Sequence, residues 1–301
     1  MKVIAGSSHP DLAAEIAKAL KVPLAKVERG NFANGERRVW IQDTVQGENV
    51  ILVQSFSEPT DEHIIEFLLL ADALERMGAR HINVVIPWMG YSLQDKVFRD
   101  GEPIAAKVVA NLVSNAYVKR AFLLDLHNSS TPGFFSIPTK HLSAMDMFVE
   151  YVKKHIKLDD AIVASPDFGG LKRSRVFAEK LGLDLANIDK QRNLKTGEVT
   201  IMGMNGKVAG KKVILCEDVI NTGSTVVECA EFLKKQGATG VYFFATHGLF
   251  AQGGLAKIDA SEVDQVIVSN SVPSQQKSSK VKYLDLAPLF ASALHTWMDR
   301  G

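Results

Sequence analysis

The feature that most constrains the fold is a series of short, continuously apolar runs, most of them rich in β-branched residues. Strands of a parallel sheet are buried on both faces, so they read as unbroken apolar runs without alternation. Helical patterns separate several of the runs, including residues 61–77 and 225–236. This order predicts an α/β fold built from β-α-β units around mainly parallel sheets. The runs predicted to be strands are residues 50–56, 81–87, 121–127, 161–167, 212–220, 241–247 and 263–271.

A weak internal repeat indicates that this architecture occurs twice. The segment "ADALERMGARHINVVIP" (71–87) is similar to "AEFLKKQGATGVYFFAT" (230–246). Both read as the end of a helix, a Gly-Ala stop and an apolar strand. Gly78 and Gly237 lie where a helix cap in the left-handed conformation is expected.

A length of 301 residues is enough for two domains with separate cores. We expect the first domain at residues 1–148 and the second at residues 149–301. The last apolar-faced helix, at residues 286–299, is expected to pack back onto a domain or a neighbouring subunit.

Net charge, apolar runs and cysteine spacing limit the classes of binding partner and the cellular compartment expected for this chain. The formal net charge of +1 gives no electrostatic argument for a nucleic-acid or membrane partner. The start, "MKVIAGSSHP", lacks the apolar core of a signal peptide, and no apolar run approaches membrane-spanning length. The two cysteines, Cys216 and Cys229, have no metal-type spacing. We therefore expect a cytoplasmic protein with reduced thiols.

The stretch "CEDVINTGST" (216–225) carries the clearest binding signal, because ligands of open parallel sheets bind beyond the carboxyl ends of strands. Glu217 and Asp218 can accept hydrogen bonds from a diol or hold a divalent ion. A small polar turn then leads into a helix, whose N-terminus suits a phosphate. Together these features fit a sugar phosphate such as ribose 5-phosphate. The alternative is a capped helix start with solvated acids. The residues of the turn are Asn221, Thr222, Gly223, Ser224 and Thr225.

Other polar residues follow predicted strands. Asp167 precedes a Gly-Gly turn and could hold a metal or a sugar hydroxyl, although a tight turn would look the same. His127 ends another strand, where a lone histidine is commonly a loop residue. Lys190 and Arg192 would share one face of an extended segment, and paired cations on a mobile loop can close over phosphates. A solvated loop is the alternative for this pair.

Two further polar segments suit nucleotide contacts. Phe32 lies in a polar turn, where it could stack on a base or fill a small satellite core. The segment at residues 89–107 combines Gln94, Lys96 and Arg99, which could contact phosphate or base or could simply be solvated. No G-x-x-x-x-G-K-[ST] loop and no G-x-G-x-x-G turn is present, so a nucleotide would be held by other means.

The joint order of these segments resembles the ribose-phosphate pyrophosphokinases, or phosphoribosyl-pyrophosphate synthetases. The resemblance runs nearly from end to end. The short length and "FRDGEPI" (98–104) look most like an archaeal-type branch. The matching segments are "GSSHPDLA", "FANGE", "GYSLQDK", "DLHNSSTPGFF", "SPDFGG", "IDKQR", "EDVINTGST" and "ATHGLF".

This resemblance implies two phosphoribosyltransferase-like domains that transfer the diphosphoryl group of ATP to ribose 5-phosphate, with Mg²⁺ required. It implies a 5-phosphate site at residues 221–225 and a ribose and ion site at Glu217 and Asp218. Lys190 and Arg192 match the family's catalytic loop. It also implies a homo-oligomer, in which an adenine-binding loop reaches a neighbour's site. The residues matched to ATP binding are Phe32, Asn34, Gly35, Glu36, Gln94, Lys96, Arg99 and His127, and those matched to the metal are His127 and Asp167.

The chain departs from the usual family pattern in the phosphate loop and the ATP segment. Glu217, Asn221 and Ser224 replace two acids and a glycine, and Leu93 stands where an arginine is usual. Two rivals therefore remain: a non-catalytic, synthetase-like regulatory subunit and a phosphoribosyltransferase. The presence of Lys190 favours a working catalyst over the regulatory subunit, and the tandem duplication favours a synthetase over a phosphoribosyltransferase.

Overall fold

The computed structural model describes residues 1–192, 199–273 and 278–298, and the side chains at 191, 192, 199, 200, 297 and 298 also lie outside that description. The chain forms two compact units. The first unit comprises Met1–Ser143, Ser271–Pro273 and Asp285–Gly301, and the second comprises Ala144–Asn270 and Ser274–Leu284.

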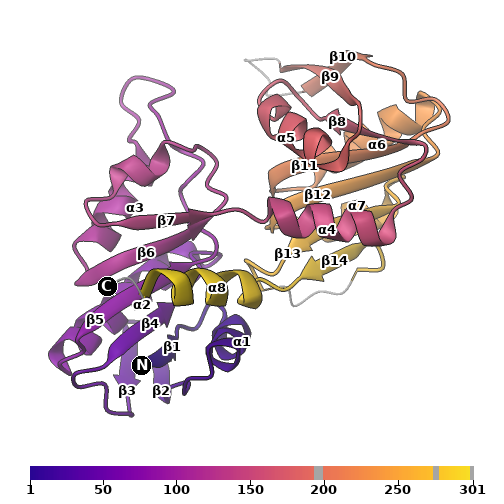
Figure 1. The fold of residues 1–301 in the computed structure, drawn as a ribbon. Coiled ribbons are helices and arrows are strands. Elements are labelled where there is room, and N and C mark those ends of the chain that lie inside the picture. The colour runs from indigo at the N-terminus through magenta and orange to yellow at the C-terminus, as the bar shows by residue number, and fades with distance from the viewer. Residues whose placement is uncertain (193–198, 274–277, 299–301) are drawn as a thin grey trace. The chain divides into compact units, whose positions relative to one another are not determined.

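The first unit is built on a five-stranded parallel sheet (Figure 1). Its strands in spatial order are β1 (Lys2–Ala5), β4 (Asn49–Val53), β5 (His81–Ile86), β6 (Val118–Leu124) and β7 (Thr139–Leu142). An antiparallel hairpin is formed by β2 (Val27–Asn31) and β3 (Arg37–Ile41). The helices of this unit are α1 (Pro10–Leu20), α2 (Thr60–Arg76), α3 (Ala105–Ser114), the 3₁₀ helix η1 (Thr131–Phe134) and α8 (Ala287–Met298).

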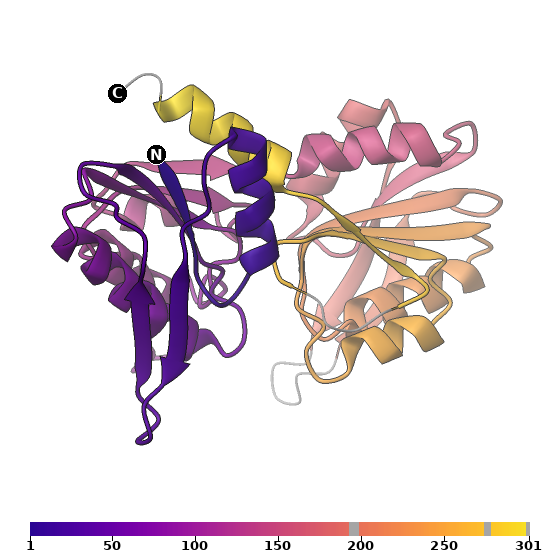
Figure 2. The same cartoon turned by 90° about the horizontal axis from the view of Figure 1, so that it is seen from below.

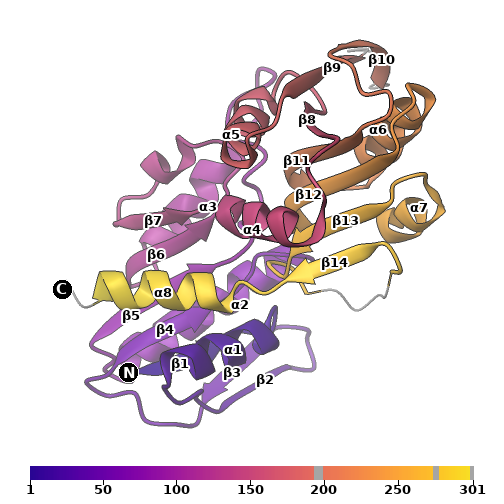
Figure 3. The same cartoon turned by 45° about the vertical axis from the view of Figure 1, so that its right-hand side comes forward.

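Helices cover both faces of this sheet. Successive strand residues point to opposite faces, and Val50 and Leu52 of β4 join the core cluster that contains Phe67 of α2 and Val109 of α3. On the other face α1 packs against β1 and β4, and α8 lies alongside α1 (Figures 2 and 3). This two-sided burial explains why the strands read as unbroken apolar runs.

The second unit is built on a seven-stranded sheet that is parallel except for one edge strand. Its strands in spatial order are β10 (Val199–Asn205), β9 (Leu185–Arg192), β8 (Ala161–Ser165), β11 (Lys212–Ile220), β12 (Gly240–Gly248), β13 (Gln265–Ser269) and β14 (Val281–Leu284). Its helices are α4 (Met145–His155), α5 (Leu171–Leu181), α6 (Ser224–Lys235) and α7 (Gly254–Ala260). The antiparallel edge strand is β10, which pairs with β9.

Alternation along β12 shows how this sheet is packed. Phe243 joins the cluster that contains Val226 of α6 and Ile258 of α7. The next residue, Phe244, points the other way and makes edge-on ring contacts with Phe148 of α4 at 5.6 Å and Phe177 of α5 at 5.7 Å. Edge-to-face ring pairs are favourable beyond the apolar area they bury.

The predicted repeat is present in the backbone. Gly78 and Gly237 have φ of 75° and 85°. After each glycine the next amide bonds back to the last helical turn, Ala79 N to Leu74 O at 3.1 Å and Ala238 N to Leu233 O at 3.0 Å. This is the Schellman arrangement, in which glycine avoids the steric cost of the left-handed conformation.

The repeat also includes a backbone hydrogen bond from each helix end to the segment before the preceding strand, which the sequence did not reveal. Gly47 N donates to Gly78 O at 2.8 Å, and Gly210 N donates to Gly237 O at 2.9 Å. Gly47 and Gly210 also have positive φ. Each unit therefore joins the end of one helix, α2 or α6, to the segment just before the strand that precedes that helix, β4 or β11, by the same contact.

The predicted α/β class is confirmed, and all seven predicted strands are present. The predicted division at 148/149 falls inside α4, because the second unit begins at Ala144. The last helix is grouped with the first unit. In the described part of the chain, none of the helices combines the length and apolar character needed to cross a bilayer.

Candidate active site

The acid pair lies on a part of β11 that extends past its neighbour. Pairing with β8 ends at Leu215 opposite Ala164, whereas pairing with β12 continues to Ile220 opposite Gly248. Glu217 and Asp218 fall in this extension. The side of β11 toward β8 is therefore open to the turn and helix that follow β8.

Arg173, in the first turn of α5, approaches both acids. Its Nη1 donates to Asp218 Oδ1 at 3.0 Å and to Glu217 Oε2 at 3.3 Å. The Asp218 side chain is only 5% exposed, so this ion pair is largely removed from water. Burial alone would lower the pKa of Arg173, but the charge of Asp218 and its neighbours raises it above the ordinary value. Arg173 is not recognisable as a site residue from the sequence, because an arginine inside a helix carries no local signal.

The Glu217 carboxyl group has a strongly raised pKa. Burial raises its pKa to about 8, and the charges of Asp167 and Asp218 add to the rise while Arg173 opposes it. A buried carboxylate near other acids favours its neutral form. A Cβ at Gly170 would lie 2.9 Å from Glu217 Oε1, so a larger residue there would displace the Glu217 carboxylate.

Asp167 closes the turn that follows β8. Its Oδ1 accepts from Gly170 N at 2.8 Å, and its carbonyl accepts from Ser165 Oγ at 2.7 Å. The turn places the Asp167 carboxylate close enough to Glu217 to raise its pKa. The predicted Asp167, Glu217 and Asp218 therefore come together, with Arg173 as the counter-ion of Glu217 and Asp218.

The turn at residues 221–225 joins β11 to the N-terminus of α6. Gly223 has φ of 79°, and a Cβ there would meet Gly254 O at 3.2 Å. Ala251 N donates to Asn221 O at 2.8 Å, so a backbone hydrogen bond from the segment after β12 stabilises the turn. Asn221, Ser224 and Thr225 are exposed, and Thr222 Oγ1 lies 3.2 Å from Ser224 Oγ. Amides and hydroxyls at a helix N-terminus suit an anion.

Lys190 and Arg192 are strand residues, which corrects the prediction that they lie on a loop. Both belong to β9, and β10 pairs with this segment in antiparallel register, with Ile201 opposite Lys190. The partner strand converts the polar segment into a sheet edge, which sequence polarity alone did not indicate. The Lys190 Nζ lies 3.5 Å from Glu228 Oε2 on α6. The side chain of Arg192 lies outside the described residues.

In the first unit, two of the predicted nucleotide segments meet. Asn128 Nδ2 donates to Asp95 Oδ2 at 2.6 Å, which ties the stretch after β6 to the "GYSLQDK" segment. His127 precedes Asn128 and is exposed. Lys96 lies 5.1 Å from the ring of Phe98, and Glu102 accepts from the amide of Arg99 at 3.0 Å. Lys96 and Arg99 therefore lie in a loop organised by its own contacts.

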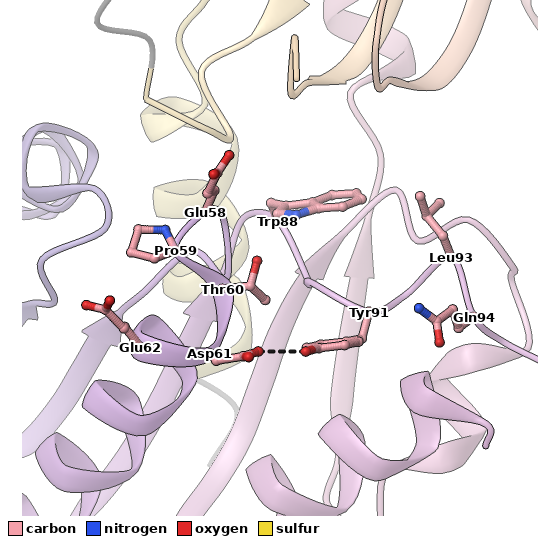
Figure 4. Close-up of a pocket in the computed structure, with 9 residues that line it drawn as sticks. All are labelled: Glu58, Pro59, Thr60, Asp61, Glu62, Trp88, Tyr91, Leu93 and Gln94. Carbon is pink, nitrogen blue, oxygen red and sulfur yellow. Dashed lines mark hydrogen bonds between the residues drawn. The ribbon is translucent and has the colours of Figure 1, made fainter. Parts of the chain in front are cut away.

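A pocket opens where β4 and β5 end (Figure 4). Gln94 and Leu93 line it together with two rings, Trp88 and Tyr91, and the Tyr91 hydroxyl donates to Asp61 Oδ1 at 2.6 Å. Aromatic and amide groups suit the flat face and polar edge of a base. The acids on the opposite wall do not suit a triphosphate, and Leu93 removes a cation from this position. The remaining lining residues are Glu58, Pro59, Thr60 and Glu62.

The hairpin of β2 and β3 carries the "FANGE" turn and extends away from the sheet (Figure 2). Phe32 N donates to Glu36 O at 2.8 Å, and Glu36 N donates to Asn34 Oδ1 at 3.2 Å. Gly35 has φ of 90°, which explains a glycine at this position. The Phe32 ring is 53% exposed, so it does not fill a satellite core within this unit.

Comparison with known proteins identifies the family. Residues 1–116 match the N-terminal domain of ribose phosphate pyrophosphokinase, and residues 190–300 match the phosphoribosyl synthetase-associated domain. Ribose-phosphate pyrophosphokinase of Wolinella succinogenes is 42% identical over 97% of this chain and 94% of its own length. That of Fusobacterium nucleatum is 38% identical over 98% and 94%. The chain belongs to the ribose-phosphate pyrophosphokinase family.

A solved structure agrees with this placement in the family. The crystal structure of phosphoribosylpyrophosphate synthetase from Mycobacterium smegmatis matches with a TM-score of 0.93 at 33% identity, over 100% of this chain and 99% of that one. The predicted family is therefore confirmed. None of these relatives supports the expectation of an archaeal-type short form.

The second unit also offers ligands that fit the Mg²⁺ implied by the family. Mg²⁺ is usually held by one or two carboxylates together with substrate phosphates and water. After burial, the charges of Asp167 and Asp218 also raise the pKa of Glu217, and a divalent cation would offset that negative charge. Across residues 1–192, 199–273 and 278–298, no three His, Cys, Asp or Glu side chains are grouped as a metal site. His127 belongs to the first unit, so its pairing with Asp167 stays a prediction.

Proposed function

We propose that the chain is a ribose-phosphate diphosphokinase, which transfers the diphosphoryl group of ATP to ribose 5-phosphate. The products are 5-phosphoribosyl 1-diphosphate and AMP. The observation that carries the proposal is full-length identity of about 40% to ribose-phosphate pyrophosphokinases, combined with acids and a phosphate-type turn at one strand end.

The turn at residues 221–225 would bind the 5-phosphate through its amides and hydroxyls. Gly223 permits the left-handed backbone that this turn needs. Glu217 and Asp218 would accept hydrogen bonds from the ribose hydroxyls. Arg173 holds the two carboxylates side by side and so fixes their direction. Asn221 offers an amide where the family pattern has a third acid, and its oxygen can still accept from a hydroxyl.

The first unit would bind ATP. Gln94 and the aromatic pocket residues lie at the carboxyl edge of its sheet, which is the ligand-binding edge of open α/β sheets. We assign Phe32, Asn34, Gly35 and Glu36 to an adenine-binding turn that acts in a neighbouring subunit, with Lys96, Arg99 and His127 completing the ATP contacts. This assignment makes the working enzyme a homo-oligomer, and we place it in the cytoplasm.

In the reaction, the anomeric oxygen forms a bond to the β-phosphorus while the bond from that phosphorus to the α,β-bridging oxygen breaks. The hydroxyl loses its proton, and the bridging oxygen leaves as part of AMP. Positioning and charge stabilisation dominate such transfers. Mg²⁺, held by His127 and Asp167 with the ATP phosphates, would neutralise phosphate charge and acidify the attacking hydroxyl. Lys190 and Arg192 would stabilise the charge on the departing oxygen.

The test follows AMP formation from Mg²⁺ and ATP with and without ribose 5-phosphate. AMP should appear only when the sugar is present. Lys190→Ala should lower kcat by about 100-fold, the typical loss for one preorganised donor. The matched control is Lys235→Ala, because Lys235 is an exposed lysine of α6. AMP formation without ribose 5-phosphate would contradict the proposal. No AMP from this chain alone, with AMP formed once a catalytic partner subunit is added, would favour a regulatory subunit.

A further inference from the structure

Lys190 has a defined partner in the ligand-free chain. Its side chain is 7% exposed, and its Nζ lies 3.5 Å from Glu228 Oε2, on a side chain that is 37% exposed. A nearly buried ammonium needs a counter-charge, because removing a charge from water is unfavourable. Glu228 supplies that charge from the second turn of α6.

The other neighbour of this ammonium is neutral. Cys229 is completely buried, and burial raises the pKa of its thiol to about 11, against the opposing influence of Lys190. The thiol therefore keeps its proton at neutral pH. Among the residues that the structure describes, Glu228 is the carboxylate paired with Lys190, and the buried Cys229 thiol lies beside the ammonium.

We propose that Glu228 is a positioning residue for Lys190, and that its carboxylate competes with substrate phosphate oxygens for the Lys190 ammonium. This inference rests on the proposed role of Lys190 in diphosphoryl transfer. In the free chain the Glu228 carboxylate forms an ion pair with the Lys190 ammonium. When ATP reacts, the ammonium exchanges that carboxylate for the departing phosphate oxygen.

The position of Glu228 on α6 allows this competition to be separated from sugar binding. The same helix begins at the turn assigned to the 5-phosphate, and Glu228 lies four residues after Ser224. Glu228 thus follows the sugar-phosphate turn by about one helical turn. Removing its charge should change steps that need Lys190 and leave the ribose 5-phosphate affinity unchanged.

The experiment compares wild type, Glu228→Gln and Glu231→Gln. Glu231 is an exposed acid of the same helix, so its variant makes the same charge change away from Lys190. Limited acetylation with acetic anhydride, followed by peptide mass spectrometry, gives the labelling rate of the Lys190 amine. Steady-state kinetics give kcat/KM for ATP, and calorimetry gives the Kd for ribose 5-phosphate.

In Glu228→Gln, Lys190 labelling and kcat/KM for ATP should each rise about two- to fivefold, the range expected for a partly exposed ion pair. The Kd for ribose 5-phosphate should not change, and Glu231→Gln should match wild type throughout. A double variant of Lys190→Ala and Glu228→Gln should have the kcat/KM of Lys190→Ala alone, because Glu228 acts through Lys190.

Two results would overturn the inference while leaving the proposed function intact. One is that the enzyme is active but the Lys190 amine of Glu228→Gln is acetylated at the wild-type rate. The other is higher labelling without a rise in kcat/KM. If wild type forms no AMP with both substrates, the proposed function and the competition fail together, and the labelling rates alone decide whether Glu228 covers the amine.

Discussion

Glu217 is a carboxylate whose burial outweighs the attraction of a nearby arginine. Its pKa of about 8 is set first by burial, then by Asp167 and Asp218, with Arg173 opposing. At neutral pH the free protein therefore holds a proton on Glu217 that the unfolded chain has already released. Ligand binding at this cluster and the stability of the second unit should both depend on pH.

We expect the ligand-free protein to lose stability as the pH rises from about 4.5 to 8, relative to Glu217→Gln. In this window the folded chain binds one more proton than the unfolded chain, so the free energy of unfolding falls with pH. Below the window both states are protonated, and above it the loss is complete at a few kcal/mol. Urea unfolding of both proteins between pH 5 and 9 measures the difference.

Glu231→Gln serves as the control in the same unfolding series, because Glu231 is exposed. Its difference from wild type should stay constant with pH. A constant difference for Glu217→Gln as well would mean that Glu217 ionises in the folded chain as it does in the unfolded chain.

At the scale of elements, the connection from β11 to α6 forms the proposed phosphate site. The turn must reverse direction within a few residues while its amides remain accessible. The strand beyond Leu215, the turn and the segment that follows β12 all contribute to this arrangement. The corresponding junction in the first unit, after β4, ends instead in the pocket lined by Asp61 and Trp88. Similar backbones therefore carry different chemistry at the two sheet edges.

Replacing Gly223 by alanine should weaken this junction. The variant adds a left-handed backbone penalty and a contact at 3.2 Å with Gly254 O. We expect a loss of more than about 1 kcal/mol in the free energy of unfolding, together with weaker ribose 5-phosphate binding.

Gly253→Ala separates the two causes. Gly253 has φ of 75°, but a Cβ there has no neighbour within 4 Å. This variant should therefore show only the backbone penalty, measured by the same denaturant unfolding. Equal losses in the two variants would show that the contact with Gly254 contributes nothing.

At the scale of the whole molecule, the proposed adenine-binding role of Phe32 in a neighbouring subunit requires its ring to be exposed, and Phe32 is 53% exposed in the turn of its hairpin. The hairpin is anchored next to its turn, where Arg37, the first residue of β3, lies 3.1 Å from Glu62 and 3.8 Å from the fully buried Glu66. Glu66 in turn accepts from Ser7 Oγ at 2.8 Å. A firmly held hairpin with an exposed ring at its end suits insertion into another subunit.

Mixing two inactive variants tests this arrangement. Phe32→Ala should impair the adenine site that its hairpin serves, and Lys190→Ala should impair its own catalytic site. If the site is shared, refolding the two together creates sites with an intact Phe32 from one subunit and an intact Lys190 from the other. AMP formation should then exceed the sum of the separate proteins severalfold.

Co-refolded Lys190→Ala with Gly223→Ala is the control for that mixture. Lys190 and Gly223 both belong to the second unit. Each site in the mixture therefore takes both residues from one chain, and mixing cannot produce an intact site. If the Phe32→Ala mixture gains no more activity than this control, each chain uses its own Phe32.

The sequence determined the α/β class, the central strands and the ends of α2 and α6. These depend on local periodicity and on glycines such as Gly78 and Gly237, and both signals can be recognised without knowing the tertiary contacts. It did not reveal the short outer strands β1, β7 and β14, each of four residues, which depend on pairing with a longer neighbour. It also placed Lys190 on a loop, because the pairing of β9 with β10 is not visible in a polar segment.

For the candidate site, the sequence identified Asp167, Glu217 and the turn at 221–225, because strand ends and helix starts have local signatures. Only the tertiary structure brought Arg173 onto Glu217 and Asp218, and Glu228 onto Lys190. These pairs are about 40 residues apart in sequence. Their partners are set by how helices pack on the sheet, which charge and spacing along the chain do not encode. The tertiary structure alone also decided the charge state of Glu217, because burial depends on the surrounding fold.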